Sequence, residues 1–146
     1  MCPYSLQRLK NDFGELLIKE RILFIGKIPQ LKIPQYVAEC QMSMVFYKNV
    51  QPNNWYCEAN RFYQSVVLGL PVVTGNNPSM KEIVDQYGFG VAIDDDGSSI
   101  KKIVEGMNQL IKEYDKYHDN AIYNRDKIKW DSQESVIQQI IMKLFE

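Results

Sequence analysis

Residues 58–73 of this chain read EANRFYQSVVLGLPVV, the pattern of a helix that ends at a glycine and is followed at once by a buried strand. Phe62, Val66 and Val67 recur at a spacing that places them on one helical face. Gly69 stands where a helix ends in a residue tolerant of positive φ, and the proline two residues later cannot continue the helix. The apolar run after that proline predicts an interior strand. A tight helix-to-strand connection of this kind is typical of a parallel sheet.

Composition limits the class of protein. The chain has 146 residues, 45% hydrophobic and 24% charged, which predicts one globular domain over 1–146 with closing helices at about 98–146. Seventeen basic and eighteen acidic residues leave no basic surplus for a nucleic-acid partner. Three cysteines without paired spacing indicate a reducing compartment. We therefore expect a cytoplasmic protein. No apolar run is long enough to span a bilayer, so we expect the chain to be soluble, with peripheral association at the inner face of the plasma membrane left open.

Helix and strand signals alternate along the chain. An apolar stripe from Leu6 to Leu17 predicts a first helix. The predicted strands are residues 21–26, 42–47, 72–74 and 91–93. The predicted helices between and after them begin near Pro34, Asn60, Pro78, Ile100 and Asp131, the last capped by Asp131 with Glu134 three residues on. Strands separated by helices predict an α/β fold with a three-layer, Rossmann-like parallel sheet flanked by helices.

In an open α/β sheet, ligands bind outside the carboxyl ends of the strands. The loops that meet this description are residues 26–30, 48–60, 74–79 and 94–99. The second and third precede helix N-termini, whose free amides and dipole favour a phosphate. The sequence therefore predicts a nucleoside diphosphate as ligand.

An ordered set of motifs covers nearly the whole chain. It comprises a strand ending in Phe-x-Gly, the Asn-Arg-Phe-Tyr-Gln helix at 60–64, Gly-Leu-Pro-Val-Val at 69–73, Asn-Asn-Pro-Ser at 76–79, and Trp130 before the last helix. This set resembles the C-terminal, sugar-nucleotide-binding domain of retaining GT-B glycosyltransferases, the glycosyl transferases group 1 or family 4-like proteins. The resemblance implies the fold of that domain without its first two strands.

The resemblance also implies the roles of individual residues. Gln64 stands where the family carries a glutamate that binds the ribose hydroxyls of the donor. An amide gives up charge-assisted hydrogen bonds, worth roughly 1.5–3 kcal/mol against about 0.5–1.5 kcal/mol for neutral ones. Tyr56 stands where a second family glutamate touches the sugar. Glu58, two positions on, is the candidate substitute and the candidate catalytic residue.

Further donor contacts follow from the same resemblance. Gly26, Lys27 and Ile28 fall in the loop that approaches the base, and Asn60 with Arg61 lies at the helix N-terminus that faces the diphosphate. The implied donor is a UDP-, GDP- or other nucleoside-diphosphate sugar, with no cofactor and no metal. The implied acceptor is a glycan or a lipid-linked glycan of polysaccharide or lipopolysaccharide synthesis, bound by a separate N-terminal domain.

That N-terminal domain and the first two family strands do not precede Met1. We therefore expect the chain to be incomplete alone and inactive as a transferase: either it is a fragment, or a partner chain or a second copy completes its sheet. The other function class is a non-catalytic, degenerate or truncated homologue that serves as a partner module. Gln64 and Tyr56 in place of acids favour this class.

Several other residues are better explained by structural roles than by functional ones. Phe62, Val66 and Val67 are expected in the core. The three acids at 94–96 precede Gly-Ser-Ser and fit a turn and a helix start better than a metal site. His118, the sole histidine, lies in a polar helical stretch and is expected at the surface.

Overall fold

The computed structural model describes residues 3–19 and 25–145, and the chain forms two compact units, residues 1–36 and 37–146. The first unit contains α1 (Pro3–Ile18), η1 (Gln30–Lys32) and most of α2 (Ile33–Val37). The first helix and the short helix at Pro34 are thus confirmed. Of the predicted strand 21–26, residues 21–24 lie outside the described part of the chain, and the last two have no regular structure.

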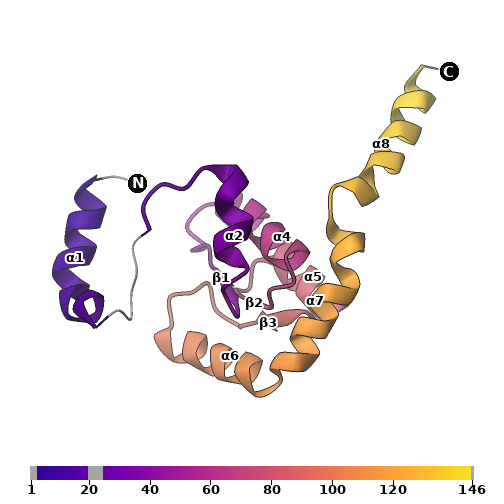
Figure 1. The fold of residues 1–146 in the computed structure, drawn as a ribbon. Helices are drawn as coiled ribbons and strands as arrows, with labels where there is room; N and C mark the ends of the chain where they lie inside the picture. Colours follow the sequence, from indigo (N-terminus) through magenta and orange to yellow (C-terminus); the bar gives the residue numbers. More distant parts are fainter. Residues whose placement is uncertain (1–2, 20–24, 146) are drawn as a thin grey trace. The chain divides into compact units, whose positions relative to one another are not determined.

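The second unit is an α/β fold (Figure 1). Its elements are β1 (Ser43–Val45), α3 (Pro52–Trp55), α4 (Asn60–Val67), β2 (Val72–Thr74), α5 (Pro78–Tyr87), β3 (Gly90–Ala92), α6 (Ile100–Lys112), α7 (Tyr114–Ile128) and α8 (Asp131–Leu144). The described strands form one parallel sheet in the order β1-β2-β3, with Val45 opposite Thr74 and Thr74 opposite Ala92. The α/β fold with a parallel sheet flanked by helices is therefore confirmed.

Helices cover both faces of the sheet. Neighbouring residues of a strand point to opposite faces, so each face has its own buried cluster. Val72 belongs to a buried cluster under α4, α5 and α7, and Val73 belongs to a second cluster under α6 and α7. Figure 1 shows α6 on one side of the strands and α4 with α5 on the other. The first cluster contains Val45, Phe62, Val66, Met80, Phe89 and Ala121; the second contains Val91, Ile93, Leu110 and Tyr117. The result is a three-layer arrangement.

The connection between α4 and β2 follows its sequence closely. Phe62 and Val66 are fully buried, and Gly69 has φ +82°. The Gly69 amide donates to the Val66 carbonyl at 2.9 Å and closes the helix. The core prediction for Val67 is wrong, because Val67 is only half-buried and Ser65 takes the buried position on the same face.

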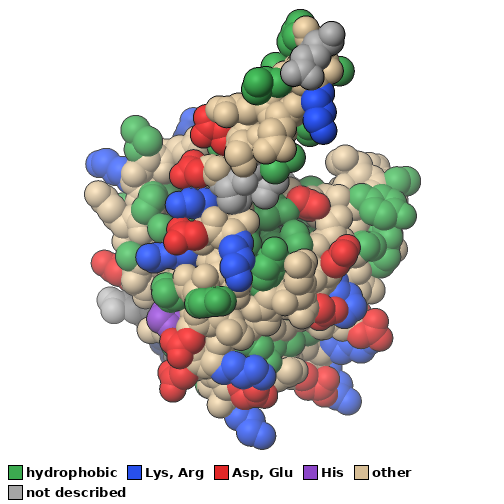
Figure 2. Space-filling view, turned by 90° about the vertical axis from the view of Figure 1, so that its right-hand side faces the viewer, with side chains coloured by type: hydrophobic (Ala, Val, Ile, Leu, Met, Phe, Trp, Pro, Cys, Tyr) green, Lys and Arg blue, Asp and Glu red, His purple; other side chains and the backbone are tan. Residues whose placement is uncertain are grey.

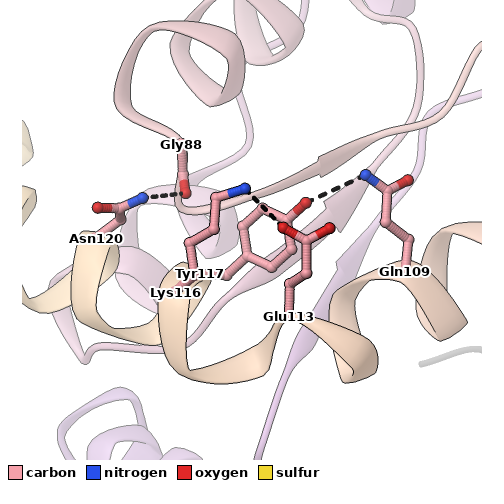
Figure 3. A network of polar contacts seen from close by, with 6 residues as sticks. All are labelled: Gly88, Gln109, Glu113, Lys116, Tyr117 and Asn120. Atoms are coloured by element: carbon pink, nitrogen blue, oxygen red, sulfur yellow. Dashed lines mark hydrogen bonds and ion pairs between the residues drawn. The ribbon is translucent and has the colours of Figure 1, made fainter.

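Side-chain amides of α7 donate hydrogen bonds to backbone carbonyls at the end of α5. Asn120 Nδ2 donates to the Gly88 carbonyl at 2.8 Å, and Asn124 Nδ2 donates to the Tyr87 carbonyl at 3.3 Å. Figure 3 shows the first of these bonds, next to the contact between Gln109 and the Tyr117 hydroxyl. Gly88 itself has φ +64° and ends α5. The polar face of α7 therefore holds two helices together.

The predicted cap of the last helix is wrong. The N-cap position is Trp130, which has helical backbone angles, φ −53° and ψ −40°, and forms no side-chain capping hydrogen bond, so Asp131 is the first helical residue and not the cap. Its carboxylate lies instead 3.9 Å from Lys129 Nζ.

Candidate functional site

The loops at the carboxyl ends of the strands are tied to one another. The Asn49 amide, after β1, donates to Asp96 Oδ2, after β3, at 3.0 Å. Asn77, fully buried after β2, donates its Nδ2 to the Asn54 carbonyl at 2.8 Å. These bonds hold the long loop that leads into α4.

The acidic triplet 94–96 forms a turn, as predicted. Asp95 Oδ1 accepts hydrogen bonds from the amides of Gly97 and Ser99, both at 2.9 Å. Hydrogen bonds from Ser98 and from the Asn49 amide hold the pKa of the Asp96 carboxyl below its usual value. Within the described ranges, no three His, Cys, Asp or Glu side chains are grouped so that they could hold a metal ion.

A cavity of about 730 Å³ lies between α4, α5 and the end of α7. Helix α4 contributes Asn60, Tyr63, Gln64 and Val67, at a spacing that forms one stripe on the helix. The other lining residues are Glu58, Ile83, Gln86, Tyr87, Lys127, Ile128, Lys129 and Trp130. The volume lies within the range of about 300–1,000 Å³ that small-molecule sites occupy.

Three of the predicted site residues meet in this cavity: Glu58, Asn60 and Gln64. Two others do not line it. Tyr56 is 65% exposed, and the Arg61 guanidinium lies over the Tyr47 ring, 5.2 Å from its centroid.

The remaining predicted residues, Gly26, Lys27 and Ile28, belong to the other compact unit. They form part of a segment without helix or strand, and the first two are exposed. The cavity is built without them.

Glu58 is held by a hydrogen bond that the sequence did not reveal. The Tyr63 hydroxyl donates to Glu58 Oε2 at the edge of the cavity. The pKa of Tyr63 is raised far above its usual value. Burial of the phenol is the largest cause, and the hydrogen bond to Glu58 and the negative charge of the Glu58 carboxylate add to it. Tyr63 therefore stays protonated at neutral pH and fixes the orientation of the Glu58 carboxylate.

The cavity wall at the end of α7 was not predicted from the sequence either. Lys127 Nζ lies over the Tyr123 ring, 4.7 Å from its centroid, and Lys129 Nζ contacts Asp126 at 3.1 Å. Trp130 lines the cavity while 71% of it remains exposed. The only sequence signal for this wall was the position of Trp130 before the last helix.

The surface around this wall is mixed in character. Figure 2 shows acidic and basic side chains interspersed over this side of the molecule, with hydrophobic side chains at the far end of α8. Within residues 3–19 and 25–145, no helix has both the length and the apolar character needed to cross a membrane.

Comparison with known proteins identifies a family. The family model described as "Glycosyl transferases group 1" matches residues 4–127. This range includes the connection between α4 and β2 and most of the cavity wall, and ends before Trp130. Neither a curated protein nor a solved structure matches the chain.

Proposed function

Since this chain belongs to the group 1 glycosyl transferases, we propose that its cavity binds the nucleoside diphosphate of a sugar donor. The proposed reaction is transfer of the sugar, with retained configuration, from a UDP-, GDP- or other nucleoside-diphosphate sugar to a glycan or lipid-linked acceptor. In this proposal the second unit corresponds to the donor-binding half of a GT-B enzyme working in the cytoplasm, and the acceptor is bound elsewhere.

One observation carries the proposal: a single cavity of nucleotide size gathers Glu58, Asn60 and Gln64. Asn60 is the first residue of α4, and no side chain caps this helix end. Its first amides and the helix dipole favour an anion such as a diphosphate. The carboxamide of Gln64, one turn further along α4, both donates and accepts hydrogen bonds, as ribose hydroxyls require.

The chemistry follows from these positions. In a retaining transfer the sugar passes through an oxocarbenium-like state while negative charge develops on the leaving diphosphate. Fixed amides and cations stabilise such charge without a protein base. Within the cavity, Asn60 would face the diphosphate and Glu58 the sugar.

Exchange of Gln64 for glutamate tests the ribose contact. We predict that Gln64→Glu tightens the binding of UDP or GDP about fivefold, roughly 1 kcal/mol, because a carboxylate forms charge-assisted hydrogen bonds with ribose hydroxyls. Isothermal titration calorimetry measures the change. Gln86→Glu, which adds the same charge to the α5 wall of the cavity, is the matched control and should bring no gain. Unchanged or weaker binding in Gln64→Glu would place the ribose elsewhere.

A second candidate function is a nucleotide-binding partner module without transferase activity. Gln64 and Tyr56 both stand where the family carries a glutamate, so neither acidic position is retained. Tyr56 also lies outside the cavity. A transfer assay with radiolabelled donor sugars tests this second candidate. We expect the 146-residue chain to bind nucleotide without transferring sugar, and efficient transfer by it would exclude the module.

A further inference from the structure

We propose that Trp130 is the platform on which the nucleobase of the bound nucleotide stacks. The inference rests on the proposed function, because it concerns the same cavity. Trp130 lines that cavity and is 71% exposed, although an indole gains much free energy from burial. A large aromatic ring left open at the edge of a concave site is placed to be covered by a ligand.

The other aromatic rings of the cavity already have partners. Tyr63 meets the Phe62 ring edge-on, 5.4 Å between centroids, and donates its hydroxyl to Glu58. Tyr87 stacks on Phe89 with an interplanar angle of 13°. Among the described residues, no ring contact or hydrogen bond involves the Trp130 indole. Trp130 is thus the cavity ring with a face left for a base.

The rest of the lining favours a whole nucleotide over a bare phosphate. Val67, Ile83 and Ile128 form an apolar wall that a phosphate would leave uncovered and a base with its ribose would cover. Glu58 and Gln64 supply oxygen and amide groups for hydroxyls. An apolar surface with a few polar groups and an open aromatic ring suits a nucleoside.

Stacking on an aromatic face accepts every base, because every base has a π-face. Trp130 would therefore contribute affinity to uridine and guanosine diphosphates alike. It would contribute nothing to inorganic pyrophosphate, which has no ring.

The two tryptophans of the chain, Trp55 and Trp130, make a direct test available. UDP and GDP are titrated into the full chain while tryptophan fluorescence is recorded, in the natural protein and in Trp55→Phe and Trp130→Phe. Trp55 lies in α3 and does not line the cavity, so Trp55→Phe is the matched control. We expect quenching in the natural protein and in Trp55→Phe, and none in Trp130→Phe.

Calorimetry adds the energetic readout. Trp130→Ala should weaken UDP and GDP about tenfold and Trp130→Phe less, because a phenyl ring still stacks. Pyrophosphate should bind all three proteins equally. If the nucleotides bind and Trp130→Ala leaves their affinity unchanged, the stacking role is overturned and the proposed function stands. If the natural protein binds neither nucleotide, both are overturned.

Discussion

The hydrogen bond from Tyr63 to Glu58 gives the folded chain a defined response to alkaline pH. The pKa of Tyr63 is raised from 10.0 in the folded protein, so above pH 10 the unfolded chain loses this proton first. The stabilisation is complete below pH 10 and is lost as the pH rises above it. We predict that Tyr63→Phe lowers the free energy of unfolding at pH 7 by about 1 kcal/mol and flattens its decline above pH 10. Urea unfolding between pH 7 and 11 measures both.

Tyr123→Phe is the control for that experiment, since Tyr123 is 75% exposed on α7. It should leave the alkaline decline as it is in the natural protein. An equally steep decline in Tyr63→Phe would contradict the assignment of this decline to Tyr63.

Site residues differ in how far sequence could reveal them. Glu58, Asn60 and Gln64 are fixed by their distance from the Gly-Leu-Pro motif, which the local helix preserves, and they lie in one cavity. Trp130 and Lys127 reach that cavity only because α7 packs against α4 and α5. No local pattern predicts such contacts, which join residues 40 or more positions apart in the chain.

Among the elements, the pairing of β2 with β3 depends on a glycine. A Cβ on Gly90 would lie 2.1 Å from the Val72 carbonyl oxygen, an atom of the neighbouring backbone. A Cβ on Gly69 would meet only the movable end of Ile122 at 2.5 Å, in addition to the strain of φ +82°. We predict that Gly90→Ala costs about 3 kcal/mol of stability and Gly69→Ala about 1–2 kcal/mol. Urea unfolding gives both values.

Gly14→Ala is the matched control, because a Cβ there meets nothing within 4 Å. Gly14 lies in α1, where alanine should be neutral or gain up to about 1 kcal/mol. If Gly90→Ala kept the stability of the natural protein, β2 and β3 would lie further apart at Gly90 than the structure shows.

Helix ends were predictable where one residue sets the backbone, as at Gly69 and Gly88. Boundaries set by distant contacts were not. Residues 48–60 were predicted as a loop, yet α3 begins at Pro52, and the buried Asn77 binds the Asn54 carbonyl of this helix from 23 positions away. The strand predicted at 42–47 narrows to Ser43–Val45, because pairing with β2 sets its length.

In the second unit as a whole, β2 and α7 join the two faces of the sheet. Val72 and Val73 point into different clusters, and α7 gives Ala121 to the first cluster and Tyr117 to the second. Removing side-chain volume on either face therefore weakens elements that the other face needs. This arrangement favours cooperative unfolding of the unit.

We predict that Phe62→Ala, in the first cluster, and Leu110→Ala, in the second, both lower the midpoint of one shared unfolding transition. Both residues are fully buried, so the expected losses are about 3–5 and 2–5 kcal/mol. Tryptophan fluorescence during urea unfolding follows this unit, because it contains Trp55 and Trp130. Ile111→Ala, beside Leu110 but 56% exposed, should change the stability by no more than about 0.5 kcal/mol. A variant that splits the transition into two steps would show that the faces fold independently, and that α7 does not couple them.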